Sequence, residues 1–246
     1  RGIAVGQTRY IAMSAVNAAG EGPKSAALSL TVPRRQLVLS YSRWPSTTLF
    51  LGVRPIGTSG PVQPLSTPGL SAIADATVSP DGKTIAFSAQ DATPTGSNLY
   101  LRGVGPDAAV TRLTSSTGNE IEPEWAPGGK ALIFSSCTSG TSCSLRTVTL
   151  AGTVTDVPGG AGLADASYLP DGSGIVAVRA ASPGGVVRVS SAGARTALAG
   201  GEGATYSAVS PDGRYVAAIV VTPGKNDKVV ILSLTGGSPR TAWAPS

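Results

Sequence analysis

Short apolar segments alternate with turns rich in glycine and proline along most of the chain, and the pattern occurs four times. Each copy contains a turn of the Pro-Asp-Gly type followed by five mostly apolar residues, with the prolines at Pro80, Pro127, Pro170 and Pro211. Proline suits the first central position of a type I turn, and glycine tolerates the positive φ that can follow. Each copy therefore predicts a hairpin between a short strand of mixed polarity and an apolar strand.

Two further strand-length segments follow each predicted hairpin. They are expected at 98–101 and 110–114, at 145–148 and 154–157, at 186–189 and 195–198, and at 229–232 and 240–243. The four prolines stand 47, 43 and 41 residues apart. Four short strands that recur every ~40–50 residues are typical of the blades of a β-propeller. The sequence thus predicts an all-β fold built of radially repeated blades.

Five units of this kind can be counted along the chain. They occupy 37–67, 71–115, 119–158, 161–199 and 202–244. The first unit is incomplete, because it has no counterpart of the strand that precedes the turn in the other four. A sixth unit is either absent or lies beyond residue 246, so an open ring and a ring closed at five blades are both open alternatives.

The turn Ser-Pro-Asp-Gly-Lys at 79–83 and the apolar strand after it resemble the TolB-type β-propeller repeat. The resemblance extends over 37–246, with the full motif in the first and fourth copies. Gly128 replaces the aspartate in the second copy, and Leu169 replaces the serine in the third. The resemblance implies a six-bladed ring that binds other proteins or gates a catalytic domain. Residues 34–246 are accordingly expected to form one TolB-like β-propeller.

Residues 1–33 do not follow the blade pattern. Two alternating segments, 10–17 and 26–33, flank a turn that contains Gly-Glu-Gly-Pro at 20–23. This arrangement resembles the last hairpin of a fibronectin type III domain, which in full has about seven strands. The resemblance implies a partial β-sandwich at the N-terminus, within a piece of a larger protein. The alternative is that the hairpin belongs to the propeller and pairs with an edge strand.

Composition narrows the possible functions. The net charge is +5, but no basic run is longer than Arg34-Arg35, and only 5% of residues are aromatic. A protein that binds nucleic acid usually has a clustered basic face with stacking aromatic residues, and this sequence shows neither. No apolar run approaches the ~20 residues that span a bilayer. The chain has no histidine, which removes histidine-based catalytic triads and most zinc sites. It also lacks the Gly-x-Ser-x-Gly turn of α/β-hydrolases. From the charge distribution, the length of the apolar runs and these missing catalytic motifs, we expect no nucleic-acid partner, no membrane span and no enzymatic activity.

The two cysteines, Cys137 and Cys143, lie at the ends of one short loop between the second and third strands of a blade. A hairpin tip brings its two ends within reach of a disulfide bond. We expect a disulfide, and hence a secreted, periplasmic or cell-surface location. The alternative is a pair of free thiols, and the small loop means that a bridge would add little stability.

Acidic residues occur at one equivalent position in three successive copies, four residues before the motif. They are Asp75, Glu122 and Asp165, and the fourth copy has Tyr206 there. Equivalent positions in radially repeated blades converge on the axis, so these acids are expected near one mouth of the central channel. There they could hold a calcium ion or a basic peptide end. The alternative is that each carboxylate accepts backbone hydrogen bonds from the neighbouring blade. Apart from calcium, no cofactor is expected.

Other polar and aromatic residues have simpler interpretations. Glu120 and Glu124 should share a strand face with Glu122, because side chains alternate along a strand. The turn residues Asp81, Asp171 and Asp212 are interpreted as turn formers. Trp44, in the tip Arg43-Trp44-Pro45, is the candidate surface contact for a protein, a peptide or a polysaccharide.

The pattern therefore favours a non-catalytic, extracytoplasmic β-propeller that serves as a binding scaffold in a larger bacterial multidomain protein. The alternative is the accessory propeller of an exported hydrolase, such as a peptidase of the prolyl-oligopeptidase type. That propeller would gate the substrate, and the catalytic domain would lie outside this sequence. A structural spacer in a surface protein is a third possibility.

Overall fold

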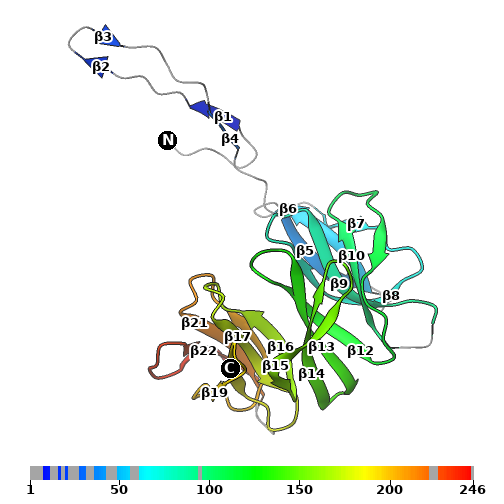
Figure 1. Ribbon diagram of the computed structural model, residues 1–246, viewed down its shortest axis with the longest axis vertical. Helices are drawn as coiled ribbons and strands as arrows, with labels where there is room; N and C mark the ends of the chain where they lie inside the picture. Colours follow the sequence, from blue (N-terminus) through cyan, green and yellow to red (C-terminus); the bar gives the residue numbers. More distant parts are fainter. Residues whose placement is uncertain are drawn as a thin grey trace. The chain divides into compact units, whose positions relative to one another are not determined.

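The computed structural model describes residues 8–11, 16–17, 20–21, 28–31, 36–42, 49–55, 61–93, 96–221 and 227–244. Every regular element in these ranges is a β-strand (Figure 1). The chain divides into two compact units. One comprises 1–37 and 53–63, and the other comprises 38–52 and 64–246.

Short antiparallel strand pairs make up the described part near the N-terminus. β1 (Thr8–Ile11) pairs with β4 (Leu28–Thr31), and β2 (Val16–Asn17) pairs with β3 (Gly20–Glu21). This pairing fits the alternating polarity of the sequence on both sides of the glycine-rich turn. The likeness of this hairpin to a fibronectin type III domain stays a prediction.

Four antiparallel sheets of four strands each, here named blades A to D, occupy 71–243. Blade A is β8 (Ser71–Val78), β9 (Thr84–Gln90), β10 (Asn98–Gly103) and β11 (Val110–Arg112); blade B is β12 (Asn119–Trp125), β13 (Ala131–Ser139), β14 (Ser142–Thr149) and β15 (Val154–Ala161). Blade C is β16 (Leu163–Tyr168), β17 (Gly174–Arg179), β18 (Val186–Ser190) and β19 (Arg195–Ala197); blade D is β20 (Ala204–Val209), β21 (Tyr215–Val220), β22 (Lys228–Ser233) and β23 (Arg240–Trp243). In each blade the strands are neighbours in the order of the sequence, so the predicted repeat is confirmed.

A fifth sheet precedes blade A and has three strands among the described residues, as the incomplete first unit predicts. It contains β5 (Gln36–Ser42), β6 (Leu49–Pro55) and β7 (Gln63–Leu65), in that order. These strands correspond to the second, third and fourth strands of the complete blades. The number of blades in a complete ring stays a prediction.

The Pro-Asp-Gly turns form as the sequence predicts. In blade A the N–H of Gly82 donates to the carbonyl of Ser79 at 2.8 Å, and Gly82 has a φ of +73°. The Asp81 carboxylate accepts from the Ser79 hydroxyl at 2.6 Å and from the Lys83 N–H at 3.1 Å. Blade B lacks the aspartate, yet Gly129 still closes its turn with a 2.8 Å bond and a φ of +65°. Glycine is therefore the common requirement, and aspartate adds side-chain bonds.

Consecutive blades pack face to face through apolar clusters. Between blades A and B the cluster contains Leu99, Trp125 and Phe134, and the Trp125 indole N–H donates to the carbonyl of Thr77 at 3.4 Å. Trp125 is only 5% exposed, so it packs between blades A and B. Valine, leucine and alanine side chains fill the interface between blades C and D. The propeller core is thus a series of apolar interfaces, one for each pair of neighbouring blades.

One charged side chain is fully buried in blade A. The Arg102 guanidinium has no carboxylate bonded to it in the described part of the chain, but it donates to the carbonyls of Ser66 (3.1 Å), Gly103 (3.1 Å), Gly105 (2.6 Å), Pro106 (3.0 Å) and Ala108 (3.4 Å). Burial lowers the pKa of Arg102 from its usual value. The bonds fix the 103–108 loop and attach the chain at Ser66 to blade A.

Candidate functional site

The predicted acids Asp75, Glu122 and Asp165 lie at matching points in the first strands of blades A, B and C. All three have a left-handed backbone, with φ values of 52°, 55° and 49°. At each point the pairing between the first and second strands shifts in register. Such bulges disrupt the ladder locally and redirect a side chain. Residues other than glycine seldom adopt positive φ, and this feature was not evident from the sequence.

These three acids connect successive blades through hydrogen bonds, which together we call the acid relay. Asp75 Oδ2 accepts from the Glu122 N–H at 3.2 Å, and Glu122 Oε2 accepts from the Asp165 N–H at 3.0 Å. Asp165 Oδ2 accepts from the Ser207 N–H of blade D at 2.6 Å. The relay thus gives each carboxylate a backbone donor in the next blade, which is the structural alternative raised from the sequence.

Serine hydroxyls of the second strands reinforce the relay. Ser88 donates to Asp75 Oδ2 at 3.1 Å, and Ser135 donates to Glu122 Oε2 at 2.7 Å. The Ser135 hydroxyl also accepts from the Asp165 N–H at 2.9 Å. Both serines are buried, with exposed fractions of 1% and 0%. They are polar residues in otherwise apolar strands, a signal from which their role could have been inferred.

The carboxylates in the relay share a poorly solvated region. Burial is the main factor that raises the pKa of Asp165 to about 7, and the nearby carboxylates of Glu122, Asp75 and Glu124 raise it further. The Ser207 N–H acts in the opposite direction because it stabilises the ionised form. Burial also raises the pKa values of Glu122 and Glu124. Asp165 therefore keeps its proton to a much higher pH than an ordinary aspartate does.

The geometry gives little support to a calcium site at Asp75, Glu122 and Asp165. Within the described ranges, no three His, Cys, Asp or Glu side chains are grouped so that they could hold a metal ion. The two neighbouring glutamates are differently placed: Glu124 accepts a long bond from Thr77 at 3.5 Å, and Glu120 is 2% exposed. Trp44, the predicted surface contact, lies outside the described residues.

A groove of about 750 Å³ opens beside the relay, among the loops of blades B, C and D. Glu122 is one of its lining residues, and the other walls come from the tip of the β13–β14 hairpin, the loop 180–184 and the segment 202–206. The lining is mainly apolar, with Tyr206 standing 55% exposed. Asp75 and Asp165 are not part of this lining.

Two charged side chains at the groove are available for a ligand. Arg179 and Glu202 are both exposed and line the groove. Neither forms a side-chain ion pair with any residue that the structure describes. The ion pairs among those residues are Arg112–Asp91 and Arg146–Asp156. A mainly apolar hollow with a few convergent polar groups is the usual form of a ligand site. Arg179 and Glu202 could not be predicted from the sequence, because they lie where no motif repeats from blade to blade, and nothing in the sequence indicated that Tyr206 would line a groove.

The predicted disulfide is present at the edge of this groove. Cys137 and Cys143 are bonded, lie opposite each other on β13 and β14, and have Cα atoms 4.0 Å apart. Both cysteines line the groove although they are only 4% and 7% exposed. The bridge holds together the hairpin whose tip, at 139–141, forms one wall.

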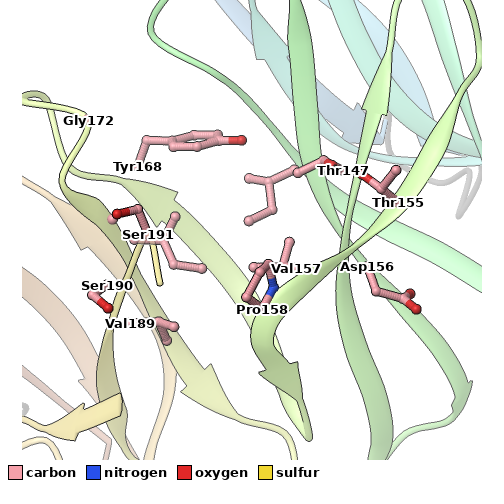
Figure 2. A pocket seen from close by; sticks show the side chains of 13 residues that line it. Thr147, Thr155, Asp156, Val157, Pro158, Tyr168, Gly172, Val189, Ser190 and Ser191 are labelled. Atoms are coloured by element: carbon pink, nitrogen blue, oxygen red, sulfur yellow. Dashed lines mark hydrogen bonds between the residues drawn. The ribbon is translucent and has the colours of Figure 1, made fainter. Parts of the chain in front are cut away.

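A smaller pocket of about 240 Å³ lies between blades B and C. Figure 2 shows Tyr168 on one side of it and Val157 and Pro158 on the other, while the Asp156 carboxylate points away. Tyr168 occupies the position of Trp125 in blade B, directly before the turn. Because a tyrosine ring is smaller than an indole, we interpret this pocket as space that the larger side chain fills between blades A and B.

Comparison with known proteins bears on the fold. No protein-family model and no curated protein matches the chain. Among solved structures, TolB from Acinetobacter baumannii superimposes with a TM-score of 0.65 and 20% identity, over 89% of this chain and 60% of TolB. The chain has the TolB-type β-propeller fold. The chain spans 60% of the length of that TolB chain, which is less than two thirds, and an identity of 20% shows the fold alone.

Two solved enzyme structures are similar to this chain over part of their own length. Puromycin hydrolase matches 79% of this chain and 32% of its own length, with a TM-score of 0.60 and 22% identity. The tricorn protease matches 81% of this chain and 21% of its own length, with a TM-score of 0.62 and 18% identity. No helix that could cross a membrane occurs in the described part of the chain.

Proposed function

We propose that this TolB-type propeller is a non-catalytic, extracytoplasmic binding module that holds a segment of another protein in the groove beside the acid relay. The observation that carries the proposal is the groove itself. Its lining is mainly apolar, and exposed Tyr206 stands at its walls with Arg179 and Glu202, neither of which has an ion-pair partner among the described residues. Tyrosine and arginine are enriched among residues that dominate binding energy at protein interfaces.

The Cys137–Cys143 disulfide supports a location outside the cytoplasm, because disulfide bonds persist mainly in oxidising compartments. The absence of histidine from the sequence supports a role in binding rather than catalysis.

Selection of a peptide library on the purified chain tests this function. We expect enriched peptides to bind the wild type, and the Tyr206→Ala and Arg179→Glu variants to bind at least tenfold more weakly. Both residues are exposed, so neither substitution should disturb the fold. Lys130→Glu, at an exposed turn outside the groove, is the matched charge control and should bind as the wild type does. Peptides that bind all four proteins equally would rule out this groove as the site.

The second candidate is an accessory propeller that filters substrates for a hydrolase. The propellers of puromycin hydrolase and the tricorn protease favour it, because this chain spans only 32% and 21% of those enzymes. The complete reading frame distinguishes the two candidates. A hydrolase domain with a Ser-His-Asp triad in the same polypeptide would favour gating, and a frame that encodes only binding modules would favour the scaffold.

A further inference from the structure

The pocket of about 240 Å³ between blades B and C is apolar where it is buried and largely polar where it meets solvent. Its buried side chains are those of Ile133, Ile175 and Val189, which are 1%, 5% and 1% exposed. Thr155 and Asp156 are among its exposed lining residues. The pocket shares no lining residue with the groove of the proposed function, so a ligand here is independent of that function.

Two positions at this interface carry smaller side chains than their equivalents between blades A and B. In the earlier interface Trp125 stands directly before the turn of blade B, and Leu101 packs in the same cluster. Tyr168 takes the place of Trp125 between blades B and C. Thr147 takes the place of Leu101, because the strand register puts the two at equivalent points of β14 and β10. A phenol and a threonine thus replace an indole and a leucine, and both line the pocket that results.

The turn glycines show that the interface is also wider at this edge. A Cβ added at Gly129 of blade B would lie 3.6 Å from Pro80 in the turn of blade A. A Cβ added at Gly213 of blade D would lie 3.2 Å from Pro170 in the turn of blade C. At Gly172 of blade C, by contrast, an added Cβ would meet no atom within 4 Å. Gly172 is exposed and lines the pocket, so a molecule can enter on this side.

The Tyr168 side chain offers the pocket both a flat ring and an unused hydroxyl. Figure 2 shows the ring along one side of the pocket, with the hydroxyl directed toward the side that carries Thr147. No hydrogen bond joins this hydroxyl to any residue that the structure describes, whereas the Thr147 and Thr155 hydroxyls bond each other at 2.8 Å. Burial raises the pKa of Tyr168, and the Glu124 carboxylate raises it further. The phenol therefore keeps its proton at neutral pH and can donate to a ligand.

We propose that this pocket binds a small, free aromatic molecule of one or two rings, similar in shape to indole. An apolar cavity of ~150 Å³ is enough for benzene, and pockets for drug-sized ligands begin at ~300 Å³. The volume of about 240 Å³ lies between these two sizes. The indole of Trp125 fills the equivalent place at the neighbouring interface. An aromatic ligand also suits the flat side of Tyr168, because aromatic rings pack favourably against each other.

Calorimetric titration of the 246-residue chain with indole tests this proposal. We expect one indole to bind per chain, with a Kd below about 1 mM. Tyr168→Trp and Thr147→Leu each introduce the side chain that fills the interface between blades A and B, so each should weaken the binding of indole at least tenfold. Tyr215→Trp is the matched control, because Tyr215 is 38% exposed in blade D and lies outside the pocket. This variant should bind indole as the wild type does.

Thermal unfolding gives a second readout, because indole should raise the melting temperature of the wild type and leave that of Tyr168→Trp unchanged. If Tyr168→Trp fails to fold, Thr147→Leu replaces it. The proposal is overturned by a wild type whose Kd for indole exceeds about 1 mM, or by pocket variants that bind indole as tightly as the wild type. Tighter binding of the peptide Gly-Trp-Gly than of indole would also overturn it, because the pocket would then hold a side chain of a partner protein.

Discussion

The carboxylate of Asp165 accepts a 2.6 Å hydrogen bond from the backbone N–H of Ser207, and this bond joins blade C to blade D. Both groups are in the first strands of their blades. In blade D the donor is Ser207, one residue after Tyr206, which stands at the position of the acids. Tyr206 is also not among the described non-glycine residues with positive φ, whereas all three acids are. At this position of the blades, the left-handed backbone is therefore found where the residue is an acid, although β20 also shifts register next to Tyr206.

We predict that Asp165 makes the protein less stable as the pH rises from about 4 to about 8. Its pKa is about 7 in the folded chain against 3.8 ordinarily. A raised pKa contributes stability below the ordinary value, and that contribution is lost as the pH rises through the folded value. Asp165→Asn keeps an oxygen acceptor for Ser207, so it should flatten this dependence and be more stable than the wild type at pH 8. The difference is expected to be on the order of a few kcal/mol.

Urea unfolding at pH 5 and pH 8 measures this effect. Asp212→Asn is the control, because the Ser210 hydroxyl and the Arg214 N–H lower the pKa of Asp212. Asp212 therefore stays ionised at both pH values, and its replacement should not change how stability differs between pH 5 and pH 8. An Asp165→Asn variant with the same pH dependence as the wild type would contradict the buried, charge-crowded environment assigned to this carboxylate.

Replacing Gly82 by valine should destabilise the domain more than replacing Asp81 by asparagine. An added Cβ at Gly82 would meet no atom within 4 Å, so the expected loss comes from the backbone alone. A β-branched residue at a φ of +73° is strained, at a cost of about 1–3 kcal/mol. The Asp81→Asn variant would still offer a side-chain oxygen at an exposed turn, where substitutions usually change stability by less than about 0.5 kcal/mol. Equal thermal midpoints for the two variants would refute the turn assignment.

Tyr168→Trp should fill the pocket between blades B and C. We expect a gain of about 0.5–2 kcal/mol, typical of successful cavity filling, because Trp125 already occupies the equivalent site at the neighbouring interface. Tyr168→Phe removes only the hydroxyl and is the matched control, with stability close to that of the wild type. Thermal unfolding distinguishes the cases, and a clearly destabilised tryptophan variant would show that the site has no room for the indole.

Arg102→Met should cost about 3–5 kcal/mol. The substitution removes a buried guanidinium and leaves the carbonyls of the 103–108 loop and of Ser66 without their donors. Arg146→Met is the control, since Arg146 forms an exposed ion pair with Asp156 that is worth at most about 1 kcal/mol. Similar unfolding midpoints for the two variants would mean that the Arg102 bonds contribute little to the fold.

The repeat predicted the blades because each strand follows local rules of turn chemistry and apolar alternation. The acids at 75, 122 and 165 were found by the same alignment, but their left-handed backbone was not, since a bulge depends on the pairing of two strands. The groove residues Arg179 and Glu202 lie in loops of unequal length, where no period connects one blade with the next. Arg102 was missed for a similar reason, because its five partners are backbone carbonyls that any sequence could supply.

The acid relay has a direction. In every bond that it makes between blades, the earlier blade supplies the carboxylate and the later blade supplies the N–H. Protein synthesis proceeds in the same sense, and N-terminal parts can fold while the rest is being made. Asp75 is thus synthesised before Glu122, and each acid is already in the nascent chain when the blade that donates to it is made. A nascent chain that follows this order would assemble its blades one after another, with each finished blade serving as the template for its successor.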